Sequence, residues 1–205
     1  ITGESEIKTL ARAAHLCKAD LVTHMVVEMT SLQGIMGRYY ALNSGETPEV
    51  AQVLFEHYLP RFTGDAVPAS RAGLLVGLAD RLDTLVGIFA IGQAPTGDKD
   101  PFALRRAALG VLRILIETQR DLDLAELLAT AAAGFPAVLK ANAAVEGVFD
   151  FMMERLRAYY TDAGIAPDVF DAVRAQRPTR PLDFHARLHA VTQFRALPEA
   201  ESLAA

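Results

Sequence analysis

At positions 71–90 the chain reads RAGLLVGLADRLDTLVGIFA, and this stretch decides the fold. Its apolar residues recur every three or four positions, which is the period of one helix face. They are Leu74, Leu78, Leu82, Leu85 and Phe89. We therefore expect a central core helix over residues 70–91. Alanine and leucine dominate elsewhere, and no segment alternates apolar with polar residues over strand length, so the sequence predicts an all-α fold.

Three helical segments are expected before this helix, and the second is a stretch interrupted by Gly34 and Gly37 that ends at Asn43-Ser44-Gly45. One apolar stripe predicts a single helix over residues 5–29, with Cys17 packed on the stripe as an inert thiol. A later helix should begin after Thr47, whose hydroxyl can cap free backbone amides, and end near Tyr58. Pro48 fits its first turn because the missing N–H needs no partner there.

Five helical segments are expected after it. They cover residues 101–119, 124–133, 143–161, 167–174 and 183–197. Asp100 and Asp183 are the expected N-caps of the first and the last, and Pro101 should occupy a first turn. A soft boundary at residues 120–123 suggests a helical core domain over residues 1–120 and a helical extension over residues 121–205.

Composition excludes several classes of protein. The chain has 205 residues, of which 51% are hydrophobic and 22% charged, so disorder and fibrous folds are excluded. Its one cysteine excludes an internal disulfide and a multi-cysteine zinc site, and suits a reducing cytoplasm. No stretch is apolar enough for a membrane span, so we expect no membrane partner. Because the chain starts at Ile1, we expect it to be a piece of a longer protein.

The charge of the chain is unevenly distributed. The net charge of −5 argues against strong nonspecific nucleic-acid binding, and we expect no DNA partner. Residues 71–113 and 154–195 nevertheless carry more basic than acidic groups, nearly all of the basic ones arginine. Lys99, Arg105 and Arg106 fall in the first turns of an expected helix, where a phosphate could dock or an unpaired base could stack. Pairing of these residues with nearby aspartates is an equally good interpretation.

The stretch GLADRLDTL (77–85) resembles the last metal-ligand helix of HD-superfamily phosphohydrolases, in which one aspartate, here Asp80, completes a metal site. Such a site also needs a histidine followed directly by an aspartate, so that adjacent side chains hold one cation for water activation. Here the doublet reads Ala19-Asp20, and alanine has no donor atom. Asp20, His24 and Glu28 recur every fourth residue and could form a replacement site with Asp80, but a hydrated helix face explains them better. We expect the degenerate site of Asp20 and Asp80 to hold no metal.

Six stretches of the sequence match a second family. They are KADLVT (18–23), LQGIMG (32–37), EHYLPRF (56–62), ADRLDTL (79–85), GQAPTGDKDPFALRRAA (92–108) and RPTRPLDF (177–184). On these motifs the chain resembles the bacterial and plastid-type glycyl-tRNA synthetase beta subunit, in its central to carboxy-terminal portion, over essentially the full length. The stretch over 92–108 is the longest and most specific of them.

The resemblance implies a noncatalytic HD-like helical domain (1–120) and an extension (121–205) leading toward an anticodon-binding domain. It implies a cytoplasmic ligase of two alpha and two beta subunits, in which the alpha subunit forms the adenylate with ATP and Mg²⁺ and the beta subunit binds tRNA(Gly). No catalytic residue and no cofactor are expected in this chain, whose partners would be tRNA(Gly), the alpha subunit and the remaining beta-subunit domains.

Charge and helix-end reasoning supplies the candidate tRNA contacts. They are Arg71, Arg81, Lys99, Arg105 and Arg106, with Arg177 and Arg180 as a second group held between prolines. Two alternatives stay open. One is an active HD phosphohydrolase that uses Asp20, His24 and Asp80, and the other is a purely structural helical spacer.

Overall fold

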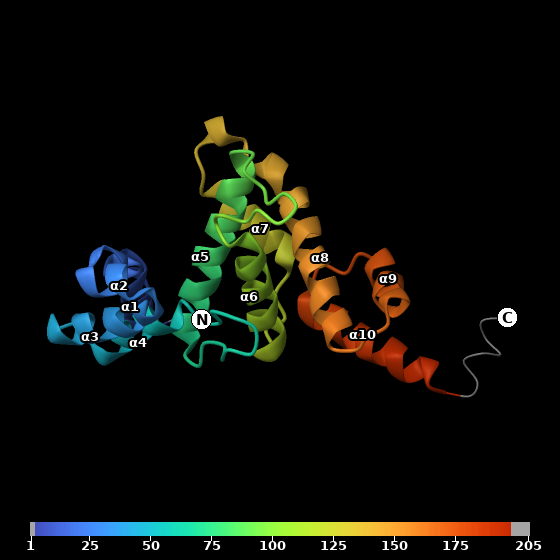
Figure 1. Ribbon diagram of the computed structural model, residues 1–205, viewed down its shortest axis with the longest axis horizontal. Helices are drawn as coiled ribbons and strands as arrows, with labels where there is room; N and C mark the ends of the chain where they lie inside the picture. The colour runs from blue at the N-terminus through green and yellow to red at the C-terminus, as the bar shows by residue number, and fades with distance from the viewer. Residues whose placement is uncertain (1–2, 198–205) are drawn as a thin grey trace. The chain divides into compact units, whose positions relative to one another are not determined.

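The computed structural model describes residues 3–197, and within that range the chain is helical (Figure 1). It has ten α-helices, four short 3-10 helices and no β-strand in this range, apart from one isolated bridge between Thr96 and Lys99. The predicted all-α fold is therefore confirmed, while the HD-like character of the core stays a prediction. No helix in the described part of the chain is long and apolar enough to span a membrane.

The chain divides into two compact units, residues 1–81 and residues 82–205, and the boundary falls inside α5 (Arg71–Ala90). The helix itself is the one predicted from the apolar repeat. Leu74 and Leu78 are buried in the first unit, and Leu82 and Leu85 are buried in the second. The two units are defined by compactness, whereas the sequence predicted a helical core domain over residues 1–120 and an extension over residues 121–205. That division stays a prediction.

The first unit begins with three short helices where one long helix was expected. They are α1 (Glu4–Leu16), η1 (Ala19–Val22) and α2 (His24–Glu28). The helix stops because Cys17 has an extended ψ of 139° and Lys18 adopts the left-handed conformation with φ 67°. This reversal turns Asp20 into the interior, where it is only 6% exposed. The prediction of one helix over residues 5–29 was wrong because the burial of Asp20 outweighs local helix propensity.

Three further elements complete this unit before α5: η2 (Thr30–Leu32), α3 (Ile35–Asn43) and α4 (Pro48–Glu56). The predicted start of α4 is confirmed, because Thr47 Oγ1 accepts a hydrogen bond from Val50 N at 3.3 Å and Pro48 occupies the first turn. Helix α4 packs against both α3 and α1 (Figure 1). Two clusters of buried residues form this core: Ala13, Val50 and Val53 with Val76 of α5, and Ala41, Ala51 and Leu54.

Cys17 lies against this core, as expected for a packed thiol. Its Sγ lies 3.0 Å from the carbonyl oxygen of Ala14, to which it donates. Burial raises the pKa of the Cys17 thiol, and the charge of Asp80 raises it further. A raised pKa leaves less of the nucleophilic thiolate, which argues against a reactive role.

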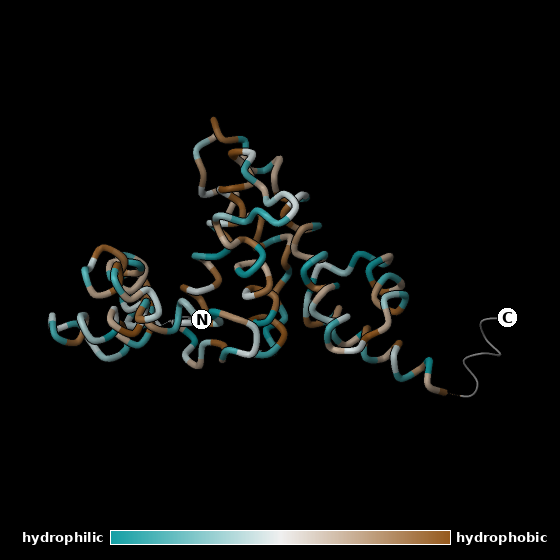
Figure 2. Tube along the Cα trace, viewed as in Figure 1, coloured by the Kyte–Doolittle hydropathy of each residue, from teal (hydrophilic) through white to brown (hydrophobic). Residues whose placement is uncertain are grey.

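The second unit contains the remaining helices: α6 (Leu104–Glu117), α7 (Leu124–Ala133), η3 (Ala137–Leu139), η4 (Ala141–Ala144), α8 (Val145–Asp162), α9 (Pro167–Ala175) and α10 (Pro181–Arg195). Helix α8 packs against α6, α7 and α9, and α10 packs against α9 and α6 (Figure 1). The largest fully buried side chains of the second unit are Leu85, Leu104, Leu112, Ile114, Leu115, Leu124, Leu128, Met152, Leu156, Phe170, Phe184 and Leu188. Hydrophobic and hydrophilic residues are interleaved along most helices, as amphipathic packing requires (Figure 2).

Two predicted helix starts in this unit are displaced. Helix α6 begins at Leu104 and not at residue 101, because Ala103 is left-handed with φ 54°. The N-cap position is therefore Ala103 and not Asp100, although the Asp100 carboxylate accepts from Leu104 N at 2.8 Å and from Arg105 N at 3.0 Å. Asp183 does not cap α10, which already starts at Pro181.

Candidate functional site

The Ala19-Asp20 doublet lies on η1, and each oxygen of the Asp20 carboxylate accepts a hydrogen bond from a protein donor. Gly34 N donates to Oδ2 at 2.6 Å and Tyr58 Oη donates to Oδ1 at 3.0 Å. Burial raises the pKa of Tyr58, and the negative charge of Asp20 contributes to the same shift. Asp20 therefore acts as a buried acceptor that joins η1 to α3 and to the end of α4.

Asp80 forms an ion pair with the ammonium group of Lys18. A protein cation thus neutralises the aspartate that a metal would need. Both His24 and Glu28 are exposed, and residues 3–197 contain no group of three or more His, Cys, Asp or Glu side chains that could hold a metal ion. The proposed replacement set of Asp20, His24 and Asp80 is not assembled, so the phosphohydrolase alternative is not supported.

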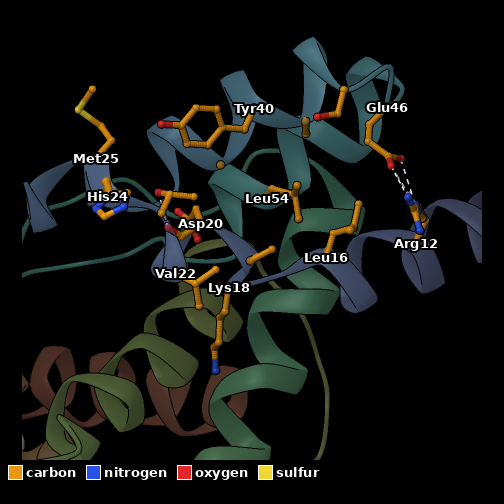
Figure 3. A pocket seen from close by; sticks show the side chains of 15 residues that line it. Arg12, Leu16, Lys18, Asp20, Val22, His24, Met25, Tyr40, Glu46 and Leu54 are labelled. Carbon is orange, nitrogen blue, oxygen red and sulfur yellow. Dashed lines mark hydrogen bonds and ion pairs between the residues drawn. The ribbon is translucent and has the colours of Figure 1, made fainter. Parts of the chain in front are cut away.

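A cavity of about 800 Å³ opens beside this doublet within the first unit (Figure 3). Its apolar lining includes Leu16, Val22, Met25 and Leu54, with the Tyr40 ring over one part of it. At the other end Arg12 Nε donates to Glu46 at 3.0 Å, so this charge is already compensated. Lys18, Asp20 and His24 also line the cavity, so the structure places Asp20 and His24 of the predicted set on one cavity. Within residues 3–197 they form no group of three metal-ligating side chains, and we assign the cavity no catalytic chemistry.

Arg81 is buried, with 8% of its surface exposed. Its guanidinium donates to the carbonyl oxygens of His57, Tyr58 and Leu59, each at 2.8 Å, and to that of Gly77 at 2.9 Å. Burial lowers the pKa of Arg81 to about 10, which leaves it protonated at neutral pH. Because its guanidinium donates to backbone carbonyl groups of its own unit, Arg81 is a structural brace. The prediction of Arg81 as a tRNA contact is corrected here, and Arg81 is left out of the candidate RNA surface.

Lys99, Arg105 and Arg106 lie around the amino end of α6, as the sequence predicted. Paired backbone hydrogen bonds between Thr96 and Lys99, at 3.0 and 3.3 Å, fix the turn that carries Lys99. Arg105 is half-buried and its guanidinium donates to the Gly97 carbonyl oxygen. Lys99 and Arg106 are exposed, and neither has a side-chain partner within residues 3–197.

Two backbone amides at this helix end are already satisfied within the protein. The carboxylate of Asp100 already accepts from the amides of Leu104 and Arg105. Any anion bound here would have to be held by side chains. The remaining candidate contacts at this end of α6 are therefore the ammonium of Lys99 and the guanidinium groups of Arg105 and Arg106.

The other candidate arginines form exposed ion pairs. Arg71 Nε lies 3.4 Å from Glu6, Arg177 lies 3.2 Å from Glu146, and Arg180 lies 2.9 Å from Asp121. Exposed pairs of this kind contribute about 0–1 kcal/mol, so a phosphate can compete for such arginines. Arg71 belongs to the first unit, whereas Arg177 and Arg180 belong to the second.

Comparison with known proteins decides the family. The profile described as "Glycyl-tRNA synthetase beta subunit" matches residues 1–175. The chain belongs to the glycyl-tRNA synthetase beta subunit family. It is 60% identical over 201 residues to the glycine–tRNA ligase beta subunit of Aromatoleum aromaticum, and 59% identical over 195 residues to that of Chromohalobacter salexigens. The protein of the same name from Haemophilus influenzae Rd is 55% identical over 203 residues.

These alignments cover 95–99% of this chain but only 28–29% of each glycyl-tRNA synthetase beta subunit. The chain thus spans less than a third of the length of these relatives. The family is shown over most of the chain, whereas the activity of the whole ligase concerns many residues outside the alignment.

The count of charges by segment in the sequence missed two arginines, Arg38 and Arg61. It singled out basic residues in net-positive segments and so passed over Arg38 and Arg61, which lie in a segment of net negative charge. In the structure each guanidinium lies over aromatic rings. The signal in the sequence is the repeated arginine–aromatic dipeptide, Arg38-Tyr39 and Arg61-Phe62.

Proposed function

We propose that this chain is a tRNA-binding and scaffolding part of the beta subunit of glycine–tRNA ligase. The relatives are named as glycine–tRNA ligase beta subunits, which supports a role for this chain in that ligase. The term beta subunit also supports an alpha subunit as a partner. We propose tRNA(Gly) as the RNA, the cytoplasm as the location, and the alpha subunit with further beta-subunit domains as protein partners. ATP and Mg²⁺ are proposed to act at the alpha subunit, so the chemistry of adenylate formation is placed outside this chain.

The observation that carries the proposal is the pair of uncompensated cations at the amino end of α6. Lys99 and Arg106 are exposed and lack an ionic partner in the described part of the chain. A phosphate that binds them displaces no existing ion pair, so no carboxylate has to be exchanged for it. Arg105 adds a guanidinium whose position is fixed by the Gly97 carbonyl.

The remaining candidates contribute more weakly in this proposal. Arg71, Arg177 and Arg180 must exchange a carboxylate for a phosphate, which returns little net free energy. Contacts of all these residues go to the sugar-phosphate backbone, so they position the RNA without reading its sequence. Recognition of tRNA(Gly) in particular is assigned to other parts of the ligase.

Reversal of charge tests this surface. We expect the double variant Lys99→Glu, Arg106→Glu to weaken binding of tRNA(Gly) by roughly 10-fold or more, since about two phosphate contacts are lost. Arg120→Glu is the matched control, because Arg120 is exposed, lacks a described ionic partner and follows the opposite end of α6. Binding is measured by fluorescence anisotropy with labelled tRNA(Gly). Equal affinities of the double variant and wild type would remove the α6 surface from the proposal.

A further inference from the structure

Five side chains of the first unit form a continuous arginine–aromatic cluster, which consists of Arg38, Tyr39, Phe55, Arg61 and Phe62. The guanidinium carbon of Arg38 lies 5.4 Å from the centre of the Tyr39 ring and 5.0 Å from that of the Phe55 ring. That of Arg61 lies 5.9 Å from Phe55 and 5.6 Å from Phe62. All four distances fall within the range of cation–π contacts, so cations and rings alternate through the cluster.

Three different elements bring these residues together. Arg38 and Tyr39 lie on α3, Phe55 lies on α4, and Arg61 and Phe62 lie in the loop that follows α4. The loop is held by Asp65, whose Oδ2 accepts from both the backbone N and the Nε of Arg61 at 2.9 Å. The helices and this local ion pair therefore position the cluster before any ligand binds.

The two ends of the cluster face solvent. Tyr39 is 54% exposed and Phe62 is 60% exposed, although each also lies against a guanidinium. The charge of Arg61 is compensated by Asp65, whereas Arg38 has no ionic partner within residues 3–197. The cluster thus presents flat aromatic surface together with a net positive charge.

We propose that this cluster binds unpaired nucleotides of RNA by stacking. Aromatic faces stack on any base, and arginine adds both a planar surface and attraction to the phosphate backbone. Protein interfaces also use aromatic and arginine side chains, but the guanidinium charge of Arg38, which has no ionic partner within residues 3–197, favours a polyanion. Only the identity of the RNA rests on the proposed function. If that function holds, the bound RNA is a single-stranded part of the tRNA.

Binding to a short fluorescein-labelled oligouridylate tests the stacking site directly, with an RNA duplex of the same length as comparison. Wild type should bind the single strand more tightly than the duplex, because duplex bases are already stacked and paired. Tyr39→Ala and Phe62→Ala should each weaken single-strand binding by roughly 10-fold, whereas Tyr39→Phe, which keeps the ring, should bind like wild type. Phe194→Ala is the matched control, since Phe194 is an exposed ring of the second unit, 44% accessible.

Crosslinking gives a readout that needs no variant. Oligouridylate containing 4-thiouridine should crosslink to peptides that carry Tyr39 or Phe62. Crosslinks confined to other peptides would overturn the stacking site, as would equal affinities of wild type, Tyr39→Ala and Phe62→Ala for the oligonucleotide.

The same preparations separate this proposal from the proposed function. If Lys99→Glu with Arg106→Glu lowers tRNA affinity while the Tyr39 and Phe62 variants bind both RNAs normally, the stacking site is wrong and the tRNA-binding function stands. If the aromatic variants lose single-strand binding while the charge reversal leaves tRNA affinity unchanged, the stacking site is supported and the α6 surface is wrong.

Discussion

The Oδ2 atom of Asp20 accepts a hydrogen bond from the backbone amide of Gly34 at 2.6 Å, in a position where Asp20 is 6% exposed. This contact joins two segments that flank α2 and fixes the start of α3. The carboxylate at the second position of the degenerate doublet thus has a structural use that needs no metal.

Loss of this carboxylate should destabilise the first unit. Asp20→Ala leaves the Gly34 amide and the Tyr58 hydroxyl without their acceptor, so we expect a loss of about 2–5 kcal/mol in the free energy of unfolding. Asp83→Ala is the control, because Asp83 is exposed. Urea denaturation followed by circular dichroism compares the two. A loss no larger in Asp20→Ala than in Asp83→Ala would show that the buried acceptor contributes little.

A methyl group at position 34 should be less well tolerated than one at position 45. Both glycines have positive φ, at 76° and 84°, so alanine is strained at either site by about 1–2 kcal/mol. Only at Gly34 would the added Cβ also meet a ring, at 2.6 Å from Tyr58 Cδ2, whereas Gly45 has nothing within 4 Å. We expect Gly34→Ala to lose about 1–3 kcal/mol more than Gly45→Ala in the same denaturation experiment. Equal losses would mean that the Tyr58 ring moves aside freely.

Removal of the Arg81 guanidinium should affect stability rather than RNA binding. Arg81→Met leaves four buried carbonyl groups with fewer donors, and we expect a loss of about 3–5 kcal/mol. Arg81→Lys should rescue little of it, since an ammonium cannot reproduce the forked geometry. Thermal denaturation measures the loss, with Arg120→Met as the exposed control. A variant that folds normally but loses tRNA affinity would return Arg81 to the RNA surface.

Protonation of His57 should weaken the fold at mildly acidic pH. Its ring is 1% exposed, and burial lowers the pKa of His57 below the ordinary value of about 6.5. The unfolded chain therefore binds this proton first, so stability is full above about pH 6.5 and falls as the pH drops toward the folded-state pKa. The pH dependence of the thermal midpoint should be smaller in His57→Gln than in wild type, while His24→Gln, at an exposed position, should keep the wild-type slope. An unchanged slope in His57→Gln would contradict this.

Local signals in the sequence were enough to predict those helices whose ends are set by neighbouring residues. The start of α4 followed from the Thr47-Pro48 cap, and the predicted range 124–133 agrees with α7. The cap of α7, Asp123, which accepts from Ala125 N at 2.9 Å, was not predicted. The core side of α5 followed from its leucine repeat. In these elements the local preference and the tertiary packing agree.

Prediction from sequence failed where a distant contact decides the backbone. Nothing near Lys18 signals a left-handed residue, because the cause is the burial of Asp20 against Gly34 and Tyr58. Arg81 has the sequence pattern of a surface arginine, yet the carbonyl groups at the end of α4 draw it inside. Among the candidate cations, local pattern could not separate exposed Lys99 and Arg106 from arginines already paired with carboxylates.

The salt dependence of tRNA(Gly) binding tests the central claim most directly. The logarithm of the binding constant of wild type should fall linearly with the logarithm of salt concentration, because phosphate contacts release counterions. In Lys99→Glu with Arg106→Glu the slope should become shallower by about one for each lost contact, while Arg120→Glu should keep the wild-type slope. Binding that is insensitive to salt, or a double variant with the wild-type slope, would contradict the account.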